Sequence, residues 1–151
     1  MTTALPKPDP IPSLTVATYN IHKGFSHFNR RLVVHDMRDG LRRMGADIVF
    51  LQEVVGHNAR HRDNREAWPA APQHEFLADA QWPAAAYVGN AVYEHGHHGN
   101  AILSRFPMVR CEHEDISTNR LEQRGLLHVE IAVPGWQHHL HCVCVHLGLF
   151  G

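Results

Sequence analysis

Two polar side chains stand where apolar strands are expected to end, and their types suit metal or phosphate chemistry. Asn20 closes the run Leu14–Asn20, and Glu53 lies near the end of the apolar run Asp47–Val55. A carboxylate in such a run is costly to bury unless it is paired or binds a cation. Glutamate oxygen is a hard ligand that suits Mg²⁺ or Mn²⁺. The structural alternative is that Glu53 meets an arginine at a sheet edge and that Asn20 is a turn residue.

The segment His138–His146 reads HHLHCVCVH and invites comparison with a zinc site. If it is a strand, Cys142 and Cys144 share one face with His146, and His141 lies on the other face. Successive residues on one face are about 6.6–7 Å apart, too far to converge on one Zn²⁺. We therefore interpret the cysteines as small core residues. His146, at the end of the strand, is placed to contact a phosphoryl oxygen.

Two further segments carry candidate ligand-binding residues. Glycine-flanked histidines precede an apolar run in His95–Arg105, where the glycines would allow close backbone approach to a ligand. We interpret these histidines as incidental to a hairpin loop and leave Asn100 undecided. Arg124 opens the next run and could bind phosphate through two nitrogens, although a surface turn residue is an equal alternative.

The elements that must position these residues form a strand–helix–strand unit followed by more strands. Apolar spacing predicts a helix over Arg30–Met44, with Asn29 as a candidate N-cap and Gly45 as its end. A short helix is expected over His74–Gln81. Further strands are expected over residues 85–93, 100–104, 109–116, 125–133 and 138–147. This order indicates an α/β to α+β class with more strand than helix.

The composition is that of one globular domain. The chain has 151 residues, 44% of them hydrophobic and 19% charged, and a formal net charge of −1. No apolar run is long enough to span a bilayer, and the N-terminus lacks the pattern of a secretory signal. Three cysteines favour a reducing, cytoplasmic compartment, with peripheral membrane association left open. Four alternating prolines predict a flexible tail over residues 1–13.

Five segments together resemble the endonuclease/exonuclease/phosphatase superfamily, and most of all its uncharacterised bacterial branch. They occur in the order and approximate spacing of that superfamily: LTVATYNIHKG (14–24), DIVFLQEVV (47–55), HGNAILSRFP (98–107), RGLLHVEI (124–131) and CVHLG (144–148). The resemblance implies a two-sheet α/β sandwich of the deoxyribonuclease-like type. It also implies a metal-dependent phosphoesterase site between the ends of the sheets.

The resemblance assigns expected roles to five residues. Glu53 corresponds to the ligand of Mg²⁺, with Mn²⁺ as an alternative, and Asn20 helps to position metal and phosphate. His146 corresponds to the histidine that contacts the scissile phosphate. Asn100 and Arg124 match recurring positions and are candidate substrate-binding residues.

One part of the family pattern does not occur in these 151 residues. The family also carries a later Asp-x-Asn and an Asp-His pair, and the pair provides the general base that activates water. The resemblance therefore implies that residues 14–151 are the first half of a domain whose C-terminal half is missing.

The sequence leads to one principal function and several alternatives. The principal hypothesis is a truncated form of a metal-dependent phosphoesterase that hydrolyses phosphodiesters or phosphomonoesters, with nucleic acid as one substrate class. The first alternative is a hydrolase of phospholipids or lipid-linked phosphodiesters. A second is an inactive chain that only binds metal or phosphate, or that pairs with a complementing chain. A third is a histidine-rich metal-binding protein, which the count of 15 histidines suggests.

Overall fold

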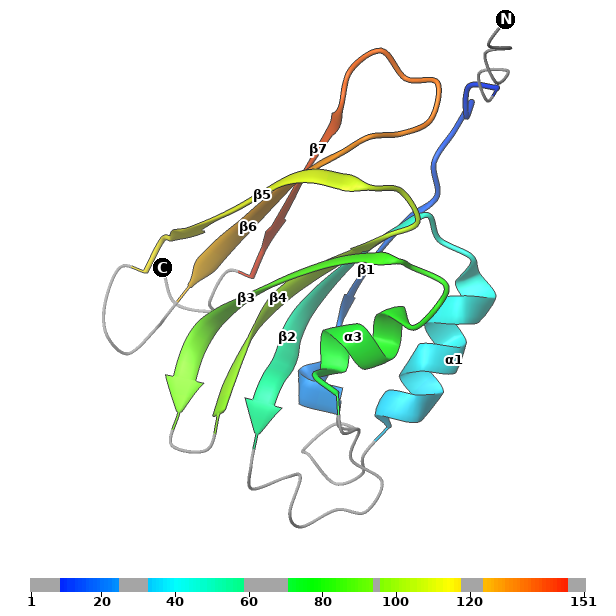
Figure 1. The fold of residues 1–151 in the computed structure, drawn as a ribbon. Coiled ribbons are helices and arrows are strands. Elements are labelled where there is room, and N and C mark those ends of the chain that lie inside the picture. The colour runs from blue at the N-terminus through cyan, green and yellow to red at the C-terminus, as the bar shows by residue number, and fades with distance from the viewer. Residues whose placement is uncertain (1–8, 25–32, 59–70, 94–95, 118–123, 147–151) are drawn as a thin grey trace, which may run out of the picture.

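The described part of the chain folds into two β-sheets and two α-helices. The computed structural model describes residues 9–24, 33–58, 71–93, 96–117 and 124–146. Figure 1 shows the elements, which in chain order are β1 (Val16–Asn20), the 3-10 turn η1 (His22–Gly24), α1 (Val34–Met44), β2 (Ile48–Asn58), α3 (Gln73–Ala78), β3 (Ala84–Tyr93), β4 (Gly96–Ser104), β5 (Met108–Asp115), β6 (Gly125–Ile131) and β7 (Leu140–Val145).

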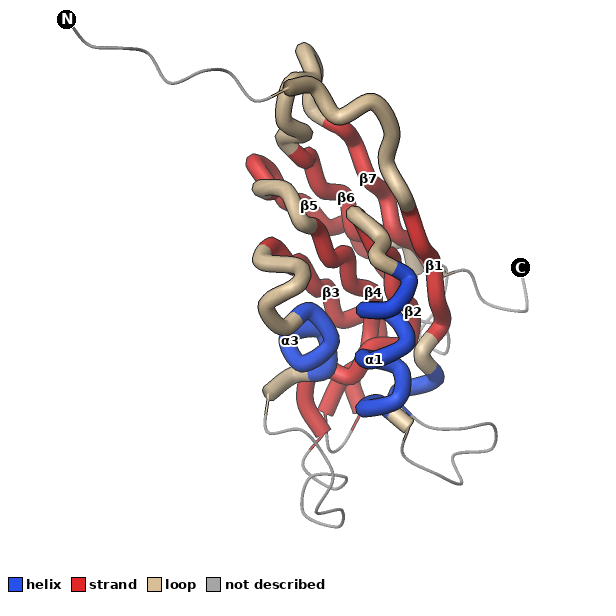
Figure 2. Tube along the Cα trace, turned by 90° about the vertical axis from the view of Figure 1, so that its right-hand side faces the viewer, coloured by secondary structure: helices blue, strands red, loops and turns tan. Residues whose placement is uncertain are grey.

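The first sheet has the strand order β1-β2-β4-β3. Strands β1 and β2 run parallel, whereas β4 is antiparallel to both β2 and β3. Helices α1 and α3 cover one face of this sheet, and the second sheet lies on the other side (Figures 1 and 2). The parallel pair follows from the helical crossover between β1 and β2, because parallel strands need a long connection.

Strand β2 is apolar on both faces because both faces of the first sheet are covered. Val49 and Leu51 pack into the core beneath the helices, whereas Ile48 and Phe50 pack toward the second sheet. A strand buried on both faces reads as a near-continuous apolar run rather than an alternating one. This explains the run that the sequence shows from residue 47 to residue 55.

The second sheet has the order β5-β6-β7 and is antiparallel throughout. The inward side chains of β6 alternate with outward ones, so that Leu127 and Val129 are fully buried while His128 lies outside. Cys142 and Cys144 are buried in the core between the sheets, and burial raises the pKa of the Cys144 thiol to about 11. The interpretation of both cysteines as core residues is confirmed.

Several predicted boundaries differ from those of the structure. Helix α1 begins at Val34, later than predicted, and the candidate cap Asn29 lies outside the described residues. Gly45 does end the helix, with a left-handed φ of 62° and its N–H donating to the carbonyl of Arg42. Strand β4 begins at Gly96 rather than at Asn100, because the histidine segment taken for a loop pairs with β2 and β3.

The predicted tail over residues 1–13 is described only from Asp9 onward. Ile11 packs partly into the core between the sheets, and its carbonyl accepts a hydrogen bond from the Trp136 indole at 2.8 Å. Residues near 11 are therefore held against the turn before β7. Among the described helices, none has the length and apolar character needed to cross a bilayer.

The layers match the predicted fold class. Two sheets face each other across one apolar core, and helices cover the outer face of the first sheet (Figure 2). The prediction of a two-sheet α/β sandwich is confirmed.

Candidate functional site

Glu53 lies at an irregularity in β2, and this irregularity decides where its carboxylate points. Alternate residues of a strand lie on the same face, so the pattern of Val49 and Leu51 would place residue 53 in the core beneath the helices. The pairing of β2 with β4 instead shifts between Leu51 and Val54, and Val54 takes the buried position. Glu53 has a φ of 54°, and its side chain is 25% exposed. The β-bulge thus turns the carboxylate out of a core in which it would be costly to bury.

The backbone of Glu53 is strained as well as irregular. A left-handed conformation costs a residue with a side chain roughly 1–2 kcal/mol. Such strain persists only where the surrounding structure enforces it, and it concentrates at functional sites. Strand β2 is held on both sides by β1 and β4, which provides that enforcement.

Asn20 lies beside Glu53 because β1 and β2 run parallel and in register. Asn20 pairs with Gln52, so the next residue of β2 comes within reach of the amide. The Asn20 Nδ2 donates to Glu53 Oε1 at 3.1 Å. Its Oδ1 accepts from the His22 backbone N–H at 2.9 Å. Both ends of the amide are therefore engaged, and Asn20 holds the Glu53 carboxylate in one orientation.

Two imidazoles flank the Glu53 carboxylate. His22 Nδ1 lies 3.7 Å from Oε2, and His146 Nε2 lies 3.9 Å from Oε1. His22 comes from η1, and His146 follows the last residue of β7. The structure therefore brings together Asn20, Glu53 and His146, which are distant in sequence. The sequence had not assigned a role to His22.

A third histidine lies behind this group. His98 of β4 pairs with Val55, two residues beyond Glu53. Burial lowers the pKa of His98 to about 4, and the charge of Lys23 acts in the same direction, whereas Glu53 opposes both. His98 is consequently neutral at physiological pH and can accept a hydrogen bond.

A buried glutamine supports the site from the helix side. Gln73 of α3 is 1% exposed; its Nε2 donates to the Lys23 carbonyl at 2.8 Å, and its Oε1 accepts from the Val55 N–H at 2.9 Å. This amide ties η1 to the strand just after the bulge. Gly24 is required here, because its φ is 80° and a Cβ would lie 2.4 Å from Gln73 Nε2. Sequence reasoning missed Gln73, since nothing local marks it.

Asn100 and Arg124 occupy different positions from the carboxylate group. Asn100 is fully buried, and its Nδ2 donates to the Gly125 carbonyl at 2.9 Å and to the Cys144 carbonyl at 3.5 Å. It therefore joins β4 to both β6 and β7. Its Oδ1 is buried and has no hydrogen-bond partner among the described residues. Arg124 is partly buried and immediately precedes β6. Its backbone N–H donates a hydrogen bond to Ser117 Oγ at 2.8 Å.

The donor set around Glu53 fits a magnesium or manganese ion. One partly exposed carboxylate is offered, its orientation is fixed by Asn20, and its neighbours are imidazoles rather than thiols. Mg²⁺ is commonly bound by one or two carboxylates, several waters and substrate phosphate oxygens. Glu53 would be the protein ligand in such a site.

Comparisons with known proteins agree with this architecture. The sequence model of the Endonuclease/Exonuclease/phosphatase family matches residues 17–141. The chain is 49% identical over 137 residues to the Escherichia coli K12 protein named "Uncharacterized protein YbhP". The match covers 91% of this chain and 54% of that protein, so the chain spans about half the length of the relative.

Solved structures share the fold at lower identity. An endonuclease/exonuclease/phosphatase from Beutenbergia cavernae has a TM-score of 0.70 at 22% identity, covering 91% of this chain and 39% of that one. A protein of the same family from Leptotrichia buccalis has a TM-score of 0.64 at 12% identity, covering 91% and 56%. With the family match and the relative at 49% identity, the chain belongs to the endonuclease/exonuclease/phosphatase family.

Proposed function

We propose that the chain carries the metal- and phosphate-binding part of a hydrolase that acts on phosphodiesters or phosphomonoesters. The observation that supports this most strongly is the strained, bulged Glu53, whose carboxylate is oriented by Asn20 and flanked by His22 and His146. An apolar residue at position 53 in a regular strand would pack without this strain and without a partly exposed carboxylate. A role in binding a cation and a phosphoryl group accounts for both.

Each side chain has a distinct part in this proposal. Glu53 holds Mg²⁺ or Mn²⁺, which when bound polarises the phosphoryl group toward attack by water. Asn20 fixes the rotamer of Glu53 through its 3.1 Å hydrogen bond. His146 donates from Nε2 to a phosphoryl oxygen and stabilises the charge that develops as the P–O ester bond breaks. Water adds to phosphorus as the P–O ester bond breaks, and the proton that the water loses is balanced by the proton that the departing oxygen takes up.

The substrate-binding role of Asn100 and Arg124 is the finer part of the proposal. Asn100 holds the ends of β6 and β7 together, and its buried Oδ1 is an acceptor still to be satisfied. Buried polar atoms of this kind are commonly satisfied by an ordered water or a ligand. We assign Asn100 to organising the strand ends from which Arg124 and His146 extend.

Metal binding tests the proposal without requiring turnover. Mn²⁺ titrated into the full chain and followed by electron paramagnetic resonance should show a site that Glu53→Gln removes. Glu75→Gln, which neutralises an exposed carboxylate on α3, is the matched control and should leave the binding unchanged. An unaltered Mn²⁺ affinity in Glu53→Gln, with the fold retained, would contradict the proposal.

Assays of hydrolysis decide which reaction and which substrate class the function includes. Bis-p-nitrophenyl phosphate and p-nitrophenyl phosphate separate diesterase from monoesterase activity, and DNA and phospholipid vesicles separate the two macromolecular substrate classes. Loss of a positioned catalytic group typically lowers a rate by about 10²–10⁴, so His146→Ala should act on this scale. Metal binding without turnover of any of these substrates would identify a chain that only binds metal or phosphate.

A further inference from the structure

A second group of metal-ligating side chains lies on the outer face of the second sheet. His128 and Glu130 are two residues apart on β6 and so point to the same side of the sheet. His141 of β7 is the register partner of Glu130. Directly opposite residues of an antiparallel pair have Cβ atoms about 4.5–5.5 Å apart, which applies to Glu130 and His141. His128 is opposite Val143 and so diagonal to His141, at a spacing of about 7–8 Å that long side chains can still bridge.

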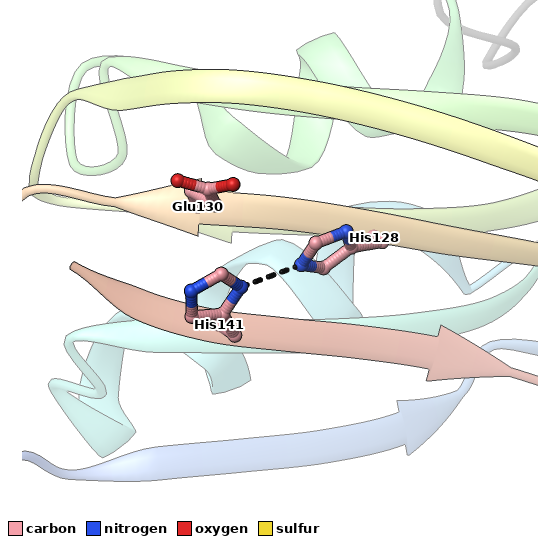
Figure 3. A group of neighbouring side chains, drawn as sticks. All are labelled: His128, Glu130 and His141. Carbon is pink, nitrogen blue, oxygen red and sulfur yellow. Dashed lines mark hydrogen bonds between the residues drawn. The ribbon is translucent and has the colours of Figure 1, made fainter.

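The donor atoms of the three side chains converge. One nitrogen or oxygen from each of the three residues lies within 4.8 Å of the others. His128 Nε2 and His141 Nδ1 are 2.9 Å apart, and the rings are stacked with centroids at 5.2 Å (Figure 3). Two imidazole nitrogens that face each other can share one proton, or they can both bind one metal ion.

Two carboxylates lie near other imidazole nitrogens around this group. Glu112 Oε2 lies 3.6 Å from His128 Nδ1, on the side of the ring away from His141. A ligating histidine commonly gives its other N–H to a carboxylate, which leaves the lone pair on the metal-facing nitrogen. Glu112 is placed to do this and thus to keep His128 Nε2 available. Glu130 Oε2 in turn lies 3.4 Å from His139 Nδ1.

We propose that His128, Glu130 and His141 bind a divalent transition-metal ion such as Zn²⁺. Bonds of about 2.0–2.2 Å in a tetrahedral arrangement place donors roughly 3.3 Å apart. The imidazoles therefore separate by a few tenths of an ångström, and the Glu130 carboxylate moves closer. Water completes the coordination, because the three side chains supply three ligands. Two imidazoles with one carboxylate select zinc-like ions rather than Mg²⁺.

This second site is separate from the Glu53 site and does not rest on the function proposed for it. The inward residues of β6, Leu127 and Val129, lie in the core between the sheets, and His128 lies on the opposite face. Arg110 opposes metal binding, since its Nη1 lies 3.6 Å from Glu130 Oε1. Removing that charge should strengthen the site.

Zinc titration by calorimetry tests the proposal on the full chain. The Glu53→Gln background excludes metal held at the other site. In that background, the double substitution His128→Ala/His141→Ala should remove one equivalent of bound Zn²⁺. His113→Ala is the matched control, because His113 is an exposed strand histidine whose register partner Leu127 points inward. Loss in the double variant with retention in the control is the expected result.

Two single substitutions keep the test decisive if the double variant folds poorly. Glu130→Gln preserves the size of the side chain and should weaken Zn²⁺ binding by at least about tenfold. Arg110→Gln should tighten it. Unchanged Zn²⁺ affinity in Glu130→Gln, or an unchanged stoichiometry in a folded double variant, would overturn the proposal.

Discussion

The two sheets of this protein differ in how many of their faces are covered. The first sheet is packed between the helices and the second sheet, and its strands β2 and β4 contribute to both apolar cores. The second sheet is covered on its inner face, while its outer face carries ionisable side chains such as His128 and Glu130. Close packing on both faces lets the first sheet hold a strained residue in place. The open face of the second sheet gathers charged groups at little desolvation cost.

This difference predicts unequal sensitivity to truncation of apolar side chains. Leu103 of β4 is fully buried beneath the helices, so Leu103→Ala should lower the free energy of unfolding by about 2–5 kcal/mol. Val143→Ala on the outer face of β7 should change it by less than about 0.5 kcal/mol, because Val143 is half exposed. Urea unfolding measures both. Equal losses would mean that the outer face is covered in solution.

The link between α3 and β2 predicts the next largest effect. Gln73→Ala leaves the Val55 N–H without its acceptor, which should cost about 1–3 kcal/mol of stability. It should also weaken Mn²⁺ binding, because the strand beside Glu53 loses its support. Gln81→Ala serves as the control, since the hydrogen bond that Gln81 makes among the described residues goes to the Arg42 carbonyl at the end of α1. Unaltered metal affinity in a less stable Gln73→Ala would confine the glutamine to a structural role.

Backbone strain at Glu53 predicts an inverted order of two substitutions. Glycine adopts a left-handed φ without penalty, so Glu53→Gly should be more stable than Glu53→Ala by about 1 kcal/mol. At the neighbouring Gln52, whose φ is not positive, alanine should instead be the more stable of the two. Thermal unfolding of the four variants decides this. The same order at both positions would argue against strain at residue 53.

At neutral pH the smallest effect comes from His98, which alters the stability only as the pH falls. The pKa of His98 is about 4 in the folded protein, below its usual 6.5. Between these values the unfolded chain binds the proton and the folded chain does not, so stability is lost as pH falls from 6.5 toward 4. His98→Gln should lessen this loss and leave the pH dependence above 6.5 unchanged. Urea midpoints of the metal-free protein measure it; a pH dependence identical to that of the wild type would contradict the assignment.

The sequence predicted the fold better than the geometry of the candidate site. Strand patterns and the resemblance were enough for the two sheets and for Asn20 as a strand-end residue. The expectation that Glu53 stands near the end of its strand was wrong, because β2 continues to Asn58 and Glu53 lies at a bulge within it. The bulge was not predictable from alternation, since a continuous apolar run carries no sign of which residue is extra. Gln73 was missed because it lies 18 positions from Val55 and contacts it only in the folded state.

The histidines of β6 and β7 also show that contacts formed only in the folded state could not be predicted from the sequence. Alternation along residues 138–146 correctly separated the faces of one strand and excluded a metal site built from that strand alone. It could not show that His128 of the adjacent strand lies diagonally across from His141, because register between strands is set by turns and packing. A high count of histidines therefore does not by itself predict a metal site. The register between strands must also be known, because it decides which histidines lie close together.

The bulge in β2 also has a consequence for how this domain can change over evolution. If one residue between Leu51 and Val54 were deleted, Val54 would still alternate correctly with Leu51 and reach the same core. The shortened chain would keep its packing and lose the left-handed corner that presents the carboxylate. A single-codon deletion at this point would thus yield a folded relative without the carboxylate that we propose as a metal ligand. We therefore expect segment length here, as well as residue identity, to decide whether a homologue retains the site.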